Sequence, residues 1–193
     1  NLKIKINWKK LAKSASFLRR NNNMECKTNG QTIEINNAKI IFKNFSGKPG
    51  VYNKEGDRNF CLLLPDDAAV DFFRRNGYSP TVKPSTSEEG EFFRYIKVKL
   101  KFNQWGPTII LKSGDKKTRV DENLVSALDS IRIESVDMDI RPYHWERPNG
   151  ESGQTAYLSG MTVYQQIDRF EQMMMETNEN GSSDNGDEGD LHF

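Results

Sequence analysis

Two stretches near the start of the patterned region alternate between apolar and polar residues. They are residues 32–36, TIEIN, and residues 38–45, AKIIFKNF. A period of two residues is typical of a half-buried β-strand. In the second stretch, Ile40 and Phe42 lie on the predicted core face. The opposite face carries Lys39, Ile41, Lys43 and Phe45.

The pattern after residue 45 continues mostly as strands. A loop with the sequence SGKPGVYNKEGD is followed by the strand RNFCLLL at residues 58–64. Further strands are predicted at residues 91–102, 106–113, 117–120, 130–146 and 154–166. The turn RPNGESG joins the last two strands as a hairpin.

The long strand at residues 130–146 changes its inward phase. Ile131 and Ile133 share one face, whereas Val136, Met138 and Ile140 fall on the other. A phase slip of one residue predicts a β-bulge near Ser135, because closed barrels use bulges where their strands bend.

Two short helices are expected between the strands. The first begins at Pro65-Asp66-Asp67, with acids in its first turn, and ends at Gly77. Its apolar face consists of Ala69, Phe72 and Phe73. Asp121 is placed to cap the second helix, which carries Leu124, Val125 and Leu128. Residues 80–90 are predicted to be polar turn material.

About six strands interrupted by two short helices indicate a mainly β protein. The pattern favours an OB-fold-like β-barrel, in which the oligonucleotide-binding (OB) topology accepts one or two short inserted helices. The stretch beyond residue 177 consists of Asn, Gly, Ser and acids, a composition that predicts disorder.

The net charge of +1 hides a strong asymmetry between the ends of the chain. Seven basic residues and no acid precede Met24, whereas six acids and no Lys or Arg follow from Glu176 onward. Blocks of like charge at chain ends predict solvated interaction tails. We therefore expect a basic extension at residues 1–30, a binding domain at residues 31–170 and an acidic tail at residues 171–193. The chain starts with Asn, so Met24 is an alternative start.

Several classes of protein are disfavoured by composition. Cys26 and Cys61 provide neither a disulfide framework nor a paired zinc motif, and only His144 and His192 could assist them. No apolar run approaches the roughly 20 residues that span a bilayer, and the N-terminus lacks the core of a secretory signal. We expect reduced thiols, no membrane association, no metal and no cofactor.

The strand EFFRYIKVKLKF at residues 91–102 carries the clearest chemical pattern. Ile96, Val98, Leu100 and Phe102 form a core face, and the other face carries Phe93, Tyr95, Lys97, Lys99 and Lys101. Lysines in line on one face repel one another unless a polyanion neutralises them. Aromatic rings beside them offer bases a stacking surface, so the pattern indicates nucleic acid with unpaired bases. The alternative is an exposed face whose lysines discourage edge pairing.

Basic and aromatic residues are combined in other segments as well. Arg58 and Phe60 share a face, and Arg141, Tyr143 and Trp145 lie at i, i+2 and i+4. Trp105 lies in a turn, where a large ring is difficult to bury. The loop after residue 45 adds Lys48, Tyr52 and Lys54, although it lacks the spacing of a P-loop.

Three other functions remain open at this point. Asp137 and Asp139, with Glu134 nearby, could hold Mg²⁺ in a nuclease, although alternate acids on a strand are more often simply solvated. RNA binding or strand annealing would use the same chemistry, because nothing in the pattern selects for or against a 2′-hydroxyl. A barrel that only binds proteins would show no affinity for oligonucleotides.

The segments KIIFKNFSGKPGVYNKEGDRNFCLLL, IRPYHWE and AYLSGMTVY resemble a family of tailed-phage single-stranded DNA-binding proteins. The resemblance covers roughly residues 33–164. It implies an OB fold that coats single-stranded DNA in phage replication and recombination, in the cytoplasm of the infected host, without catalysis. It leaves a homodimer open. The DNA-facing positions that it implies are Lys43, Phe45, Arg58, Phe60, Arg141, Tyr143 and Trp145.

Combining the pattern with the resemblance gives the predicted DNA-binding set. It consists of Lys43, Phe45, Lys48, Tyr52, Lys54, Arg58, Phe60, Tyr95, Lys97, Lys99, Lys101, Trp105, Arg141, Tyr143 and Trp145. The chain ends in GDEGDLHF, and acidic tails that end in an aromatic residue are shared by such proteins. We expect the tail to recruit replication or recombination proteins through Asp187, Glu188, Asp190, Leu191 and Phe193.

Overall fold

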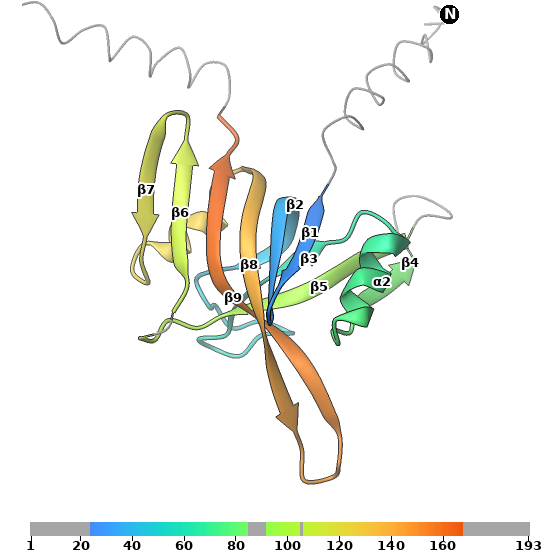
Figure 1. The fold of residues 1–193 in the computed structure, drawn as a ribbon. Helices are drawn as coiled ribbons and strands as arrows, with labels where there is room; N and C mark the ends of the chain where they lie inside the picture. The colour runs from blue at the N-terminus through green and yellow to red at the C-terminus, as the bar shows by residue number, and fades with distance from the viewer. Residues whose placement is uncertain (1–23, 85–91, 105, 168–193) are drawn as a thin grey trace, which may run out of the picture.

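The computed structural model describes residues 24–84, 92–104 and 106–167 (Figure 1). In this part of the chain the strands are β1 Glu25–Asn29, β2 Thr32–Asn44, β3 Arg58–Leu63, β4 Thr81–Pro84, β5 Phe92–Leu100, β6 Thr108–Ser113, β7 Lys116–Val120, β8 Ile133–Glu146 and β9 Ser152–Gln165. Helix α2, Asp67–Arg75, follows β3, and the 3-10 helix η1, Val125–Asp129, follows β7. The expectation of a mainly β fold with one or two short inserted helices is confirmed.

Five of the strands close into a barrel. β2 pairs with β3, β3 with β5, β8 with β2 and β9 with β8, all antiparallel. The ring is completed by a short parallel pairing in which Val98 lies opposite Ala156 and Lys99 lies opposite Tyr157. Beyond this point β9 pairs with β6 instead, which places the β6–β7 hairpin outside the barrel (Figure 1). A five-stranded closed barrel confirms the predicted OB-like architecture.

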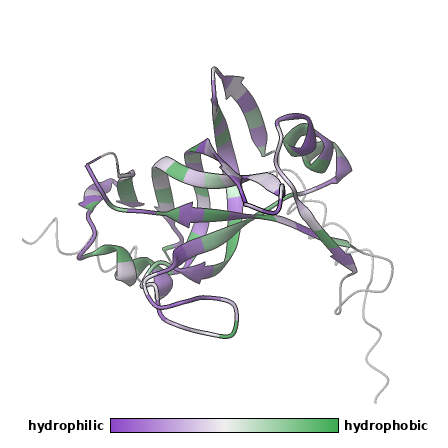
Figure 2. Ribbon diagram, turned by 90° about the horizontal axis from the view of Figure 1, so that it is seen from below, coloured by the Kyte–Doolittle hydropathy of each residue, from purple (hydrophilic) through white to green (hydrophobic). Residues whose placement is uncertain are grey.

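The core fills the inside of this barrel with alternate side chains from each strand. Ile96, Val98 and Leu100 of β5 are buried, as their period of two predicts. Polar and apolar residues alternate visibly along the strands in Figure 2. The alternation fixes which side chains remain on the outer wall, and the functional site is built from these.

The strand boundaries depart from prediction where polar residues find a pairing partner. Residues 81–84, predicted as a turn, form β4 because they pair antiparallel with β5. Residues 25–29, assigned to the N-terminal extension, form β1 and pair with β2 through a turn at Gly30. The predicted bulge near Ser135 is confirmed by a register shift between Ile133 and Ser135.

Two bulges in β2 were missed by the sequence pattern. The register shifts between Ile35 and Ala38 and again between Ile41 and Asn44. Each irregularity contains a non-glycine residue with positive φ, Asn37 at 53° and Phe42 at 50°. An extra residue in a strand reverses which face every later side chain occupies. The second bulge therefore exchanges the predicted inner and outer positions at the end of β2.

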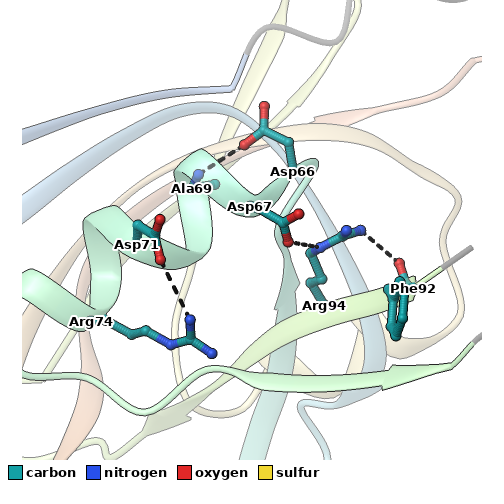
Figure 3. A network of polar contacts seen from close by, with 7 residues as sticks. All are labelled: Asp66, Asp67, Ala69, Asp71, Arg74, Phe92 and Arg94. Atoms are coloured by element: carbon teal, nitrogen blue, oxygen red, sulfur yellow. Dashed lines mark hydrogen bonds and ion pairs between the residues drawn. The ribbon is translucent and has the colours of Figure 1, made fainter.

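Helix α2 is fixed at its N-terminus by its own side chains and by β5 (Figure 3). The carboxylate of Asp66 accepts a hydrogen bond from the backbone N–H of Ala69 at 2.8 Å, as the sequence predicted for a helix start. Asp67 accepts from Nε of Arg94 at 2.7 Å, and Arg94 also donates to the carbonyl of Phe92. Val70 and Phe73 bury the opposite face of the helix in the core.

The cap predicts a measurable loss of stability in Asp66→Ala. Removing the cap leaves a backbone N–H of the first turn without its partner, so the free energy of unfolding should fall by about 1 kcal/mol. Urea denaturation measures this loss. Asp71→Ala is the matched control, because Asp71 makes only an exposed ion pair with Arg74 one turn away. Equal losses in the two variants would contradict the capping role.

Candidate nucleic-acid interface

The outer face of β5 carries the predicted row of lysines. Lys97 and Lys101 are exposed, and Lys99 is half-buried, whereas Ile96, Val98 and Leu100 point into the core. The assignment of faces from the sequence pattern is therefore confirmed for this strand. Its lysines are thus presented together on the barrel wall.

A groove of about 420 Å³ runs beside this row, where the loop between β2 and β3 meets β5 and β9. It is lined by Tyr52, Gly56, Asp57, Arg58, Asn59, Lys97, Lys99, Leu100, Lys101 and Tyr157. Its charged lining comprises four cations and a single carboxylate, Asp57. The groove therefore has the charge expected for a site that follows a phosphate backbone.

Tyr157 lies at the centre of this surface and was not predicted from the sequence. The register places it between Arg141 of β8 on one side and Lys99 of β5 on the other. An aromatic ring thus lies between two cationic side chains in one row across three strands. No sequence signal identifies this row, because three distant segments supply it and only the closure of the barrel brings them together.

The predicted aromatic residues of β8 extend the surface along the hairpin that projects from the barrel (Figure 1). Tyr143 is exposed, and its ring packs edge-on against Tyr157 with centroids 5.7 Å apart. Trp145 lies over Gly153, where an added Cβ would come within 2.5 Å of Cζ2. The guanidinium of Arg147 lies 5.2 Å from the centroid of the Trp145 ring. The structure therefore places Arg141 and Tyr143 beside Tyr157 of the groove, and Trp145 further along the hairpin.

A second group of aromatic rings lies beyond Lys97, at the N-terminal end of the lysine row. Phe42, Phe93 and Tyr95 form an outer aromatic cluster with centroids 5.4 to 6.3 Å apart. Phe42 is 67% exposed to solvent, which is a large apolar surface for a residue in a β-strand. The sequence pattern placed Phe42 in the core, because a bulge with positive φ is not visible in a strand period.

The loop that borders the groove is held in a defined shape. Asn44 is buried and donates to the carbonyls of Lys48 and Asp57, and its own oxygen accepts from the N–H of Lys48. The carboxylate of Asp129 accepts from the N–H groups of Phe45 and Ser46, both at 2.8 Å. These bonds fix both ends of the loop and leave its tip projecting.

The tip of the loop projects Val51 and Tyr52 into solvent, at 91% and 89% exposure. Lys48 and Lys54 are exposed on the same loop, and their contact with DNA stays a prediction. Asn53 anchors the loop to the groove, because it accepts from Lys97 at 3.0 Å and from Asn59 at 2.9 Å.

The prediction that Phe45 and Phe60 contact DNA is wrong. Phe45 and Phe60 have no exposed surface and pack against each other in the core with centroids 5.5 Å apart. A fully buried ring has no face on which a base can stack. The bulge in β2 turned Phe45 inward. For Phe60 the sequence carried a usable signal, since Leu62 and Leu64 share its phase and are also buried.

Lys43, a predicted contact residue, has a structural role, and its contact with DNA stays a prediction. Its ammonium donates to the carbonyls of Leu128 and Ile131 at 2.9 and 2.7 Å, which ties η1 to β2. Burial lowers the pKa of Lys43, and the Asp129 carboxylate offsets part of this effect. Lys43 thus uses two of its three ammonium N–H groups to stabilise the structure that holds the loop.

Arg58 lines the groove with its charge already paired. Its guanidinium lies 2.5 Å from the Glu122 carboxylate and packs over the ring of Phe102 at 5.5 Å. A phosphate would have to compete with Glu122 for this group. Trp105 and the tail residues Asp187, Glu188, Asp190, Leu191 and Phe193 lie outside the described residues.

Asp137, one of the carboxylates considered for a nuclease, makes two hydrogen bonds within the domain. Asp137 accepts from the N–H of Asn37 at 2.9 Å and from the hydroxyl of Tyr164 at 2.6 Å. The described residues contain no cluster of three or more His, Cys, Asp or Glu that could hold a metal ion.

Cys26 and Cys61 are free thiols. Burial raises the pKa of Cys26 to about 11, which keeps this thiol protonated and unreactive at neutral pH. Among the described helices, none has the length and apolar character needed to cross a bilayer.

Solved structures similar to this chain include three of the single-stranded DNA-binding protein from bacteriophage Enc34. Its C-terminal truncation gives a TM-score of 0.46 at 13% identity, over 76% of this chain and 97% of that chain. Its complex with ssDNA gives 0.47 at 13% identity, over 77% and 98%. A third structure gives 0.44 at 14% identity, over 77% and 93%. No curated protein matches the chain.

The model of a phage ssDNA-binding domain matches residues 23–184, which is most of the chain. The match spans the whole barrel, with its groove and its outer aromatic residues. The chain therefore belongs to the family of phage single-stranded DNA-binding domains.

Proposed function

We propose that this chain binds single-stranded DNA, without selecting base sequence, along the groove beside β5. The row Arg141, Tyr157 and Lys99 is the observation that carries the proposal. Cations on both sides of an aromatic ring suit phosphates on both sides of a stacked base. Every base has a π-face, so such a surface tolerates any sequence.

The proposed path uses the outer wall on either side of this row. Tyr143 and Trp145 would stack bases along the hairpin, and Lys97 and Lys101 would neutralise phosphates. The outer cluster of Phe42, Phe93 and Tyr95 continues the stacking surface beyond Lys97. Lys48, Tyr52 and Lys54 would close over the strand from the loop. In this role the protein coats single-stranded DNA during phage replication and recombination and performs no catalysis.

Salt dependence provides the direct test of the groove. The affinity for a labelled poly-dT oligonucleotide should fall with salt, because log K drops by roughly 0.7 per neutralised phosphate per log unit of salt. Lys99→Ala should weaken binding and reduce this slope by about 0.7, as measured by fluorescence anisotropy at several salt concentrations. Arg75→Ala is the control, since Arg75 is exposed on α2 and does not line the groove. A slope equal to the wild type in Lys99→Ala would refute the contact.

The same titration against an RNA oligonucleotide of equal length tests the choice of ligand. Tighter binding of RNA would support the alternative function of an RNA-binding protein.

Phe42 was predicted to be buried and is exposed, whereas Phe60 was predicted to be exposed and is buried. Their alanine variants should therefore have opposite phenotypes. Phe42→Ala should weaken DNA binding by about 1–3 kcal/mol while it leaves unfolding nearly unchanged, because an exposed ring is removed. Phe60→Ala should lower the free energy of unfolding by about 3–5 kcal/mol, because it opens a cavity in the core. Anisotropy and urea denaturation separate the two effects. A Phe42→Ala protein with full affinity would remove the outer cluster from the DNA path.

We also propose that the acidic tail recruits replication or recombination proteins. Its acids are suited to occupy the basic groove when DNA is absent, by weak electrostatic competition. DNA would displace the tail, and Leu191 and Phe193 would then enter an apolar pocket of a partner, whose basic rim would take the terminal carboxylate.

Deleting residues 177–193 tests this competition. The truncated chain should bind poly-dT more tightly at low salt, and the difference should vanish at high salt, where screening removes the attraction. Leu191→Ala with Phe193→Ala is the matched control, because it keeps the charge and should retain wild-type DNA affinity. Identical affinities of the truncated and full chains at low salt would contradict the competition.

A further inference from the structure

A second basic and aromatic surface lies where the C-terminal half of β9 pairs with the β6–β7 hairpin, on the outer face of the sheet that continues from the barrel wall. The register across β9, β6 and β7 aligns Tyr164, Lys112 and Lys117 in one row. The ammonium of Lys112 lies 4.8 Å from the centroid of the Tyr164 ring. Arg119 lies in the next outward row, opposite Ile110. These are the residue types that form the DNA groove, again brought together from separate strands.

This surface is hollowed and open. A cavity of about 740 Å³ lies against it, with Lys39, Lys112, Ile133 and Tyr164 in its lining. Glu134 is the acid in the same lining. The ammonium of Lys39 donates to the backbone carbonyl of Glu134, so Lys39 belongs to the wall of the cavity. Lys117 and Arg119 are exposed at its β7 edge.

Carboxylates separate this surface from the groove. Glu34 and Asp139 lie opposite each other on the outer wall of β2 and β8. Burial, with a contribution from the Glu34 charge, raises the pKa of Asp139. Asp137 lies two residues before Asp139 on the same face and accepts a hydrogen bond from the Tyr164 hydroxyl, so it lies at the edge of the second surface. A single phosphate backbone that ran from Tyr157 to Tyr164 would pass these acids over a distance of roughly 20 Å. The two basic surfaces are therefore separate sites.

We propose that the surface formed by Lys112, Lys117, Arg119 and Tyr164 binds a second nucleic-acid strand. One molecule then holds two strands on one wall, and complementary strands are brought together for annealing. The assignment of the ligand class rests on the proposed function of the groove. Two other readings are distinct outcomes of the test: the cations guard the β7 edge against strand pairing, or they attract the acidic end of this chain.

Stoichiometry of a short oligonucleotide tests the proposal. A poly-dT of about six nucleotides, within the ~4–16 nucleotides that one OB fold binds, fits one surface only. Native mass spectrometry of the full chain at low salt should show two oligonucleotides per molecule. Lys117→Glu combined with Arg119→Glu should lose the second oligonucleotide, retain the first, and slow the annealing of complementary labelled strands. Both side chains are exposed, so a thermal melt should match the wild type.

Two matched variants sharpen the result. Lys116→Glu reverses the neighbouring charge on the opposite face of β7, so it should keep both oligonucleotides. Lys99→Glu should lose the groove-bound oligonucleotide and retain the other, and its failure would count against the proposed function alone.

Binding of one oligonucleotide to the wild type, with no change in the β7 double variant, would overturn the inference in favour of edge protection. A different result would overturn it in favour of the acidic end of the chain. The wild type would then hold one oligonucleotide, and the double variant would bind that oligonucleotide with altered affinity.

Discussion

The surface depends on a parallel pairing of only two residue pairs between β5 and β9. Val98 opposite Ala156 closes the barrel around its core, and Lys99 opposite Tyr157 forms the centre of the groove. Adjacent positions of a strand point to opposite faces, so one short ladder serves the core and the ligand surface at once. Any change that breaks this ladder opens the barrel and separates the lysine row from the rings of β8 and β9.

The switch of β9 from β5 to β6 follows from the same constraint. A register shift between Asp139 and Ile140 of β8 lies where β9 leaves β5. The pairing of β9 with β6 begins at Gly160. The N-terminal half of β9 thus completes the barrel and the groove, while its C-terminal half supports β6 and β7. Two basic surfaces on one wall, with the carboxylates of Glu34 and Asp139 between them, are a consequence of this division.

Sequence periodicity predicted the fold class, the two helices, the bulge at Ser135 and the outward lysines of β5, because these depend on local patterns. It failed for Phe42, Phe45 and Phe60. A bulge with positive φ reverses the faces of β2 without changing its composition, and the inward phase of β3 was read without weighing Leu62 and Leu64. The structural role of Lys43 was missed because the carbonyls that it binds lie about 85 residues away. Tyr157 was missed because its neighbours belong to other strands.

The proposed path places the bound strand along β5 and the β8–β9 hairpin. Photocrosslinking of a thymine oligonucleotide to the full chain, followed by mapping of the modified residues by mass spectrometry, locates that strand directly. We expect adducts on Tyr157, Tyr143 and the outer cluster of Phe42, Phe93 and Tyr95. Adducts confined to α2 or β1, with none on these rings, would contradict it.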